Sequence, residues 1–188
     1  MLVEAGGGGR LSANQIKRSG GVGVGLREGA TTQLRNNTIA ECGGGGVHVA
    51  GPVQSPPICP APCRAALSLS PTISYPSILK GGAILAENEI VANLLVGVRL
   101  SGGADPLLEK NRVSESGSQG VLVEGASTLG RLLRNVIEAN GAEGMLVQPG
   151  GAPVLGEIYV RRDAGDPERH AAEEHGPTGR TQSRANES

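Results

Sequence analysis

The stretch LLEKNRVSESGSQGVLV, residues 107–123, contains a motif that recurs along the chain. It has a leucine, an asparagine three residues later, an apolar residue two beyond that, and then Gly-Val-x-Val. Similar strings occupy 85–100 and 132–147, and two earlier copies occupy 11–24 and 34–49. Successive asparagines are 23, 51, 23 and 24 residues apart. A repeat of this length indicates a solenoid of stacked coils.

The aligned asparagines predict one column of side chains along the solenoid. They are Asn14, Asn37, Asn88, Asn111 and Asn135. Asparagine tolerates left-handed backbone angles and hydrogen-bonds locally at turns, so we expect each one to form a bend. Neighbouring β-strands lie about 4.8 Å apart. Identical amides stacked at that spacing can hydrogen-bond to each other as a ladder.

Two kinds of solenoid have periods near this length, the leucine-rich repeat and the parallel β-helix. A leucine-rich repeat would need leucines three, five and eight positions before the asparagine, and only the first is present. A parallel β-helix needs short strands with inward apolar side chains, broken at the corners by glycine or asparagine. The sequence therefore predicts an all-β parallel solenoid of about five to six coils.

The composition agrees with thin stacked layers. The chain has 188 residues with 31 glycines, no phenylalanine and no tryptophan, so its core must be built from leucine, isoleucine and valine. Its formal net charge is −1, which gives no field that favours nucleic acid or an anionic membrane. No apolar run approaches the roughly 20 residues of a spanning helix, and no secretory signal is visible. We therefore expect neither nucleic acid nor a membrane as partner, and an intracellular location.

The strings GADPLLEKNRV at 103–113 and GVLV at 120–123 resemble the right-handed β-helix repeats of pectate-lyase-like proteins. Within that group they are most similar to the intracellular repeats of the F-box-only β-helix proteins, which present substrates to a cullin ubiquitin ligase. The resemblance covers about residues 3–50 and 83–158. It implies a right-handed parallel β-helix and a protein partner, in substrate recognition within an intracellular ubiquitin-ligase pathway.

The repeat divides the chain into four parts. Residues 1–50 and 83–160 carry coils, and the proline-rich segment 51–82 is either an insertion or a degenerate coil. Residues 161–188 are charged and nearly free of apolar side chains, so we expect a disordered tail. Neither end of the coil pattern offers a polar cap. We interpret the chain as a fragment of a longer solenoid.

Catalysis is the competing interpretation, as a polysaccharide lyase or an epimerase-like carbohydrate-active protein. Glu89 and Arg112 occupy equivalent positions on adjacent coils, where they form either an exposed ion pair or a catalytic pair. We expect no cofactor and no metal. Cys59 and Cys63 have no further ligands nearby in the sequence, and the two histidines of HAAEEH, 170–175, are five residues apart and diverge on a helix.

The Val-x-Val strands predict a candidate recognition face. Alternation sends the valines inward and the middle residue outward, which gives the column Gly23, His48, Arg99, Leu122 and Leu146. Two leucines beside a histidine and an arginine favour a contact surface for a protein partner. A neighbouring loop or the tail covering them is the other interpretation, and both stay open at this point.

Overall fold

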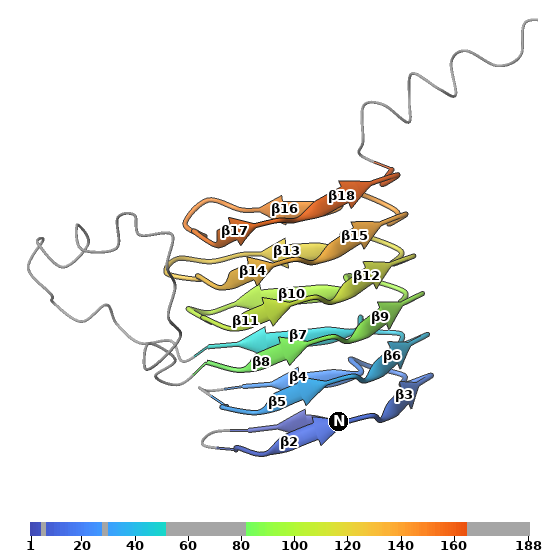
Figure 1. Ribbon diagram of the computed structural model, residues 1–188, viewed down its shortest axis with the longest axis vertical. Helices are drawn as coiled ribbons and strands as arrows, with labels where there is room; N and C mark the ends of the chain where they lie inside the picture. Colours follow the sequence, from blue (N-terminus) through green and yellow to red (C-terminus); the bar gives the residue numbers. More distant parts are fainter. Residues whose placement is uncertain (5–6, 28–29, 52–81, 165–188) are drawn as a thin grey trace, which may run out of the picture.

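The computed structural model describes residues 1–4, 7–27, 30–51 and 82–164. These residues form three six-stranded sheets, A, B and C, in which all neighbouring strands are parallel (Figure 1). The described part contains only strands and turns, and no helix in it is long and apolar enough to cross a membrane. The predicted all-β parallel solenoid is confirmed.

Each sheet takes every third strand of the chain. Sheet A contains β1 (Leu2–Val3), β4 (Val24–Leu26), β7 (Val47–Ala50), β10 (Val98–Ser101), β13 (Val121–Val123) and β16 (Met145–Val147). Sheet B contains β2 (Arg10–Ser12), β5 (Gln33–Arg35), β8 (Ile84–Ala86), β11 (Leu107–Glu109), β14 (Arg131–Leu133) and β17 (Val154–Gly156). Sheet C contains β3 (Gln15–Lys17), β6 (Thr38–Ala40), β9 (Glu89–Val91), β12 (Arg112–Ser114), β15 (Val136–Glu138) and β18 (Tyr159–Arg161).

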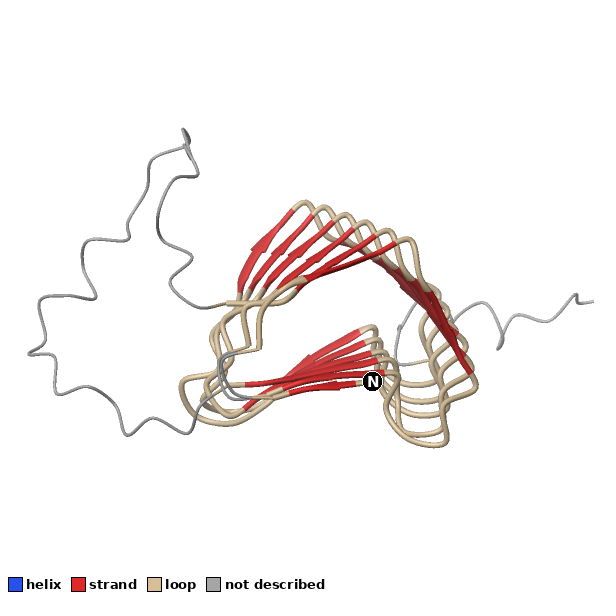
Figure 2. Ribbon diagram, turned by 90° about the horizontal axis from the view of Figure 1, so that it is seen from below, coloured by secondary structure: helices blue, strands red, loops and turns tan. Residues whose placement is uncertain are grey.

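One coil consists of a strand from sheet B, one from sheet C and one from sheet A. Figure 2, which looks along the solenoid, shows the three sheets as three sides around a common interior. Equivalent residues pair in register from coil to coil, as Leu108 does with Leu85 on one side and with Leu132 on the other. The 23- or 24-residue spacing therefore returns each side chain to the same place one coil further on.

Aliphatic columns fill the interior. The middle residue of each sheet B strand points inward, and Leu34, Leu85, Leu108 and Leu132 are at most 1% exposed. Sheet C contributes Ile39, Ile90, Val113 and Ile137 to the same core cluster. Burying one such side chain stabilises the fold by roughly 1.5–3 kcal/mol. The solenoid thus builds its core without aromatic rings because each coil needs only one or two inward side chains per strand.

The proline-rich segment follows β7 and precedes β8 in the chain. Residues 52–81, predicted to be an insertion or a degenerate coil, lie outside the described part of the chain. The coils on either side stack directly, since β5 pairs with β8 and β7 pairs with β10. The stack is therefore continuous across the 51-residue gap in the repeat.

The corner geometry differs from the prediction in one respect. The ladder asparagines do not themselves adopt left-handed angles; the residue before each ladder position does, with φ between 51° and 56°. These residues are Ala13, Asn36, Glu87, Lys110, Arg134 and Glu157. The prediction that the asparagine makes the left-handed bend is therefore wrong by one residue. The asparagine side chain turns inward and hydrogen-bonds instead.

Two boundaries also change. In the first copy the sheet A strand is Val24–Leu26, so Gly25 and not Gly23 continues the outward column. At the other end Arg161 still belongs to β18, and Asp163 is only 1% exposed. The sixth, partial coil therefore reaches past the predicted start of the tail, and residues 165–188 lie outside the described part.

Candidate functional site

The asparagine column is a hydrogen-bonded ladder inside the solenoid. Asn111 illustrates its geometry: its Oδ1 accepts from the backbone N–H of Asn88 at 3.0 Å and from the Asn88 amide at 2.9 Å. Its own Nδ2 donates to the Leu85 carbonyl at 2.8 Å and to Oδ1 of Asn135 at 3.0 Å. The same pattern joins Asn14 to Asn37 and Asn37 to Asn88. Asn37, Asn88, Asn111 and Asn135 are buried in the interior, where they hold the coils together, whereas Asn14 at the start of the ladder is exposed.

A second polar column runs five residues after the first, and the sequence analysis did not identify it. Its members are Ser19, Cys42, Asn93, Ser116, Asn140 and Asp163. Oδ1 of Asn93 accepts from the Cys42 N–H at 3.1 Å, and Oδ1 of Asp163 accepts from both the N–H and the amide of Asn140, at 2.7 and 2.8 Å. The recurring asparagine at this spacing was the available signal, and it was weak because the position varies.

The predicted recognition column lies on the outer side of sheet A. Strand pairing aligns Gly25, His48, Arg99, Leu122 and Leu146 one above another. The two valines or leucines that flank each of them in the three central strands point inward and are buried. The structure therefore brings the four predicted recognition residues together on one face.

Polar contacts cross-link the middle of this face. Nε2 of His48 lies 2.9 Å from the hydroxyl of Ser101, and the Arg99 guanidinium binds the Glu124 carboxylate. Burial lowers the pKa of His48, and repulsion from Arg99 and Arg27 lowers it further. Both effects favour the neutral imidazole, in which one ring nitrogen donates and the other accepts.

Leu122 requires a correction. It follows the outward direction of the column but is only 8% exposed, and Leu146 is half-buried. The expectation that two exposed leucines form the contact surface is therefore not met. Alternation along a strand fixes the direction of a side chain but not what covers it. Leu122→Asp would place a charge in an apolar setting and destabilise the fold, so it is not a clean test of binding.

Exposed leucines lie instead at the corner that leads into β10. Leu94 is 67% exposed and Leu95 is 51% exposed. Leu95 borders a depression of about 70 Å³ on the outer side of sheet A, which we call the sheet A depression. Its lining comprises Val22, Gly44, Gly45, Val47, His48, Leu95, Val96 and Arg99. Two of the four predicted recognition residues, His48 and Arg99, thus lie beside an exposed leucine.

The His48–Ser101 contact resembles part of a nucleophilic pair. A serine nucleophile also needs a group that orients the second imidazole nitrogen and donors for the developing oxyanion. Among the described residues no hydrogen bond to Nδ1 of His48 is present. The geometry therefore supports a polar contact on a binding face better than a catalytic centre.

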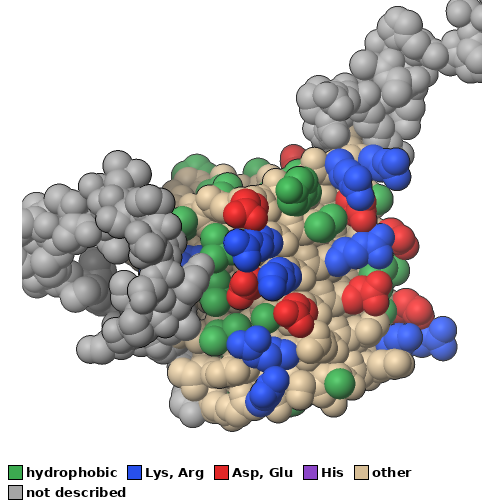
Figure 3. Space-filling model, in the orientation of Figure 1, with side chains coloured by type: hydrophobic (Ala, Val, Ile, Leu, Met, Phe, Trp, Pro, Cys, Tyr) green, Lys and Arg blue, Asp and Glu red, His purple; other side chains and the backbone are tan. Residues whose placement is uncertain are grey.

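The candidate catalytic pair belongs to a chain of ion pairs on sheet C. Arg112 lies 3.7 Å from Glu89 but only 3.0 Å from Glu138, which in turn binds Arg161 at 2.9 Å. Burial alone would raise the pKa of Glu138, but hydrogen bonds from Arg112 and Arg161 outweigh it and hold that pKa below its ordinary value. Figure 3 shows acidic and basic side chains interleaved over the face of sheets B and C. Arg112 pairs with the carboxylates of both Glu89 and Glu138, which is the arrangement of a structural ion-pair network.

Metal ligands do not gather in the described part of the chain. No group of three or more histidine, cysteine, aspartate or glutamate side chains suited to a metal is found there. Cys42 is buried, and its thiol lies 3.4 Å from the Ala40 carbonyl. Cys59, Cys63 and the HAAEEH histidines lie outside the described residues, so the structure says nothing about them.

No family model, no curated protein and no solved structure matches the chain. The case for function therefore depends on the geometry described above and on the residues themselves.

Proposed function

We propose that the chain is a protein-recognition solenoid that binds its partner at the sheet A depression. The observation that carries the proposal is the position of Leu95, half-exposed beside His48 and Arg99 at the edge of a small hollow. Small-molecule sites usually enclose about 300–1,000 Å³. A hollow of about 70 Å³ suits a single side chain of a partner protein. Leu94 extends the apolar contact beyond the hollow.

The chemistry of the partner follows from the lining. Leu94 and Leu95 favour an aliphatic or aromatic side chain, and aromatic anchors are common at the centre of protein interfaces. Arg99 is 48% exposed at its side chain although it pairs with Glu124, so it can accept an acidic group of the partner at the rim. We therefore expect a segment in which one large apolar residue lies close to a carboxylate.

The biological setting is proposed from the resemblance to F-box-only β-helix proteins. It suggests substrate recognition in an intracellular ubiquitin-ligase pathway, with the sheet A depression as the substrate contact. The repeated Leu–Asn–Ile coils and the continuous outer face of sheet A support a recognition role, since extended solenoid surfaces commonly bind proteins.

The test compares two sets of substitutions in the full chain. A photo-crosslinking amino acid at Leu95 should capture partner proteins from cells, and the same group at Leu129, which is 42% exposed and distant in the chain, should not capture them. Leu94→Asp with Leu95→Asp should remove the captured set, whereas Leu129→Asp should keep it. Cullin-ligase subunits or ubiquitin-modified proteins in the captured set would support the pathway. Equal capture from both positions would contradict the proposed surface.

Carbohydrate chemistry is the competing proposal, and the Glu89–Arg112 pair is the observation in its favour. If the chain is a lyase, Glu89→Gln and Arg112→Ala should each remove turnover of an acidic polysaccharide, while the substitutions at Leu94 and Leu95 should leave it unchanged. Turnover that depends on these two charged residues would overturn the recognition proposal in favour of catalysis.

A further inference from the structure

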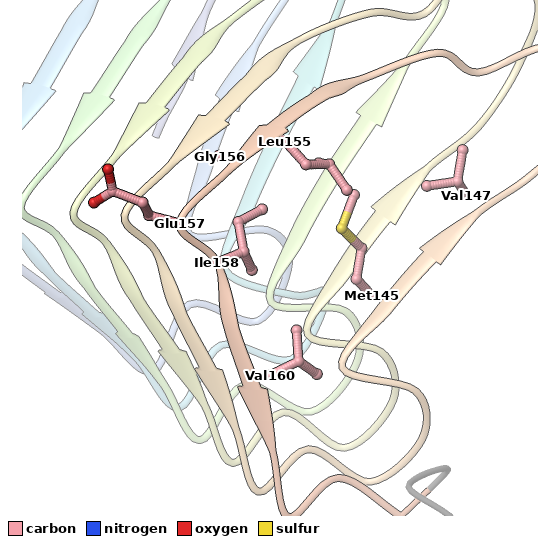
Figure 4. A pocket seen from close by; sticks show the side chains of 7 residues that line it. All are labelled: Met145, Val147, Leu155, Gly156, Glu157, Ile158 and Val160. Carbon is pink, nitrogen blue, oxygen red and sulfur yellow. The ribbon is translucent and has the colours of Figure 1, made fainter.

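The C-terminal end of the solenoid exposes core positions. Figure 4 shows Met145, Leu155, Ile158 and Val160 converging on an open hollow that nothing in the described chain caps. Leu155 is 53% exposed and Val160 is 49% exposed, although their equivalents one coil earlier, Leu132 and Ile137, are fully buried. The last coil therefore presents the inward surface that every other coil covers with its neighbour.

The N-terminal end is the opposite surface of the same stack. Val3, Leu11 and Ile16 pack on the core from one side and are only partly buried. Their strands β1, β2 and β3 each pair with a single neighbour in the described chain. An edge of this kind presents a row of backbone N–H and C=O groups that can pair with another parallel strand.

The two ends also match in phase. The strands follow the order A, B, C along the chain, beginning with β1 in sheet A and ending with β18 in sheet C. The next position after β18 therefore belongs to sheet A, on top of β16, and β1 of a second copy fits it. The β2 and β3 strands of that copy then fall on β17 and β18.

We propose that copies of this chain stack head to tail, with β1–β3 of one copy continuing the three sheets of the next. Extending the observed register places Val3 over Val147, Leu11 over Leu155 and Ile16 over Val160. These are the inward columns of sheets A, B and C, and each of these three pairs is apolar. The contact is heterologous, so it leaves a free end on each side and extends into a filament.

Charge gives this contact a salt dependence that distinguishes it from an interface held by opposite charges. The same register places Lys17 over Arg161 and Arg18 over Arg162, and like charges directly opposite each other in a sheet oppose pairing. Raising the salt from about 20 mM to about 500 mM shortens the Debye length from roughly 20 Å to about 4 Å. Stacking should therefore increase with salt, whereas an interface held by opposite charges should weaken.

Sedimentation velocity of the full chain tests the proposal. At high salt and rising protein concentration we expect the weight-average mass to increase at least about twofold over the monomer, without a fixed end point. Leu155→Lys blocks the C-terminal end and Leu11→Lys blocks the N-terminal end, so each variant alone should remain monomeric. Leu129→Lys, a change of the same kind at an exposed leucine one coil below the C-terminal end and outside the junction columns, should associate like the parent chain.

Mixing the two blocked variants gives the decisive result. One retains a free N-terminal end and the other a free C-terminal end, so an equal mixture should form one-to-one dimers and nothing larger. Circular dichroism identifies any variant that has lost its β structure, and in that case Val160→Lys replaces the first and Ile16→Lys the second. A two-fold symmetric contact of one end with itself would let one variant dimerise alone. That result, or a parent chain that stays monomeric at high salt, overturns the proposal.

Discussion

Replacing Asn111 by alanine should destabilise the solenoid far more than replacing Asn14 by alanine. Asn111 lies in the middle of the ladder, and its side chain takes part in four hydrogen bonds. Asn14 lies at the start of the ladder and is exposed, and its side chain donates one hydrogen bond, to Asn37. The two substitutions remove the same atoms from equivalent positions, so their difference measures what the ladder contributes.

The magnitude follows from what each change leaves unpaired. Asn111→Ala leaves the buried N–H of Asn88 without its acceptor, which costs about 1–3 kcal/mol. It also removes one hydrogen bond each from the Asn88 amide, the Leu85 carbonyl and Asn135. The Asn88 amide and Asn135 each keep another hydrogen-bond partner. Summing these terms gives about 3–5 kcal/mol. For Asn14→Ala one exposed hydrogen bond is lost, so we expect at most about 1 kcal/mol.

Urea unfolding followed by far-ultraviolet circular dichroism provides the assay. The slope of the transition should stay the same for the parent and both variants, because the surface exposed on unfolding hardly changes. The midpoint should fall strongly for Asn111→Ala and slightly for Asn14→Ala. Equal losses at the two positions would refute the ladder as a source of stability. The strands would then be held by apolar stacking and backbone pairing alone.

Three further outcomes are expected. Ala139 has a φ of 55°, so Ala139→Gly should raise the free energy of unfolding by about 0.5–1 kcal/mol. Ala86 lies in the strand β8, so Ala86→Gly should lower it by a similar amount. Urea unfolding measures both changes. Asp163 has a buried Oδ2 without a hydrogen-bond partner, so Asp163→Asn should raise the melting temperature. An unchanged or lower melting temperature would show that this oxygen already has a hydrogen-bond partner in solution. The pKa of Glu138 is lowered in the folded state, so its contribution is present above the ordinary glutamate pKa and is lost as pH falls through the folded value. Glu138→Gln should therefore flatten the acid limb of the stability–pH profile, and a parallel profile would argue against the Arg112–Glu138–Arg161 network.

The columns that repeat chemically could be predicted from the sequence. Leucine, asparagine and a β-branched aliphatic residue (isoleucine, or valine at Val113) return at fixed offsets in every full coil. The structure pairs them in register, as with Leu85, Leu108 and Leu132. A solenoid makes this possible because each coil meets the same neighbour on either side. The placement of sheets B and C follows almost entirely from those three offsets.

The second polar column could not be predicted in the same way. Its positions change from serine to cysteine to asparagine to aspartate, and among the described residues only Asn93, Asn140 and Asp163 accept from a backbone N–H of the preceding coil. The left-handed corners could not be predicted from the sequence either, because lysine and glutamate, as at Lys110 and Glu87, have no preference for left-handed backbone angles. The stack imposes that geometry on them. A local signal is absent wherever the neighbouring coils decide the conformation.

The exposed fraction of individual side chains could not be predicted from the sequence either. Alternation correctly sends Leu122 outward, yet it is 8% exposed, while Leu95 at a corner with no periodicity is 51% exposed. Coverage depends on side chains from adjacent coils and corners, which a period-2 pattern does not describe. The candidate binding surface therefore shifts from the predicted leucines to the corner before β10, although His48 and Arg99 remain part of it.

The sixth coil lacks the asparagine ladder that joins the other coils to one another. The two proposals depend on different parts of the solenoid. Ile158 occupies the ladder position, so the asparagine ladder ends at Asn135, whereas the second column continues to Asp163. The last coil consequently lacks one of the two polar columns that hold its neighbours, while its apolar side chains lie open. Loss of that coil would abolish head-to-tail stacking. It would leave the sheet A depression intact, because Leu95, His48 and Arg99 belong to coils two and three.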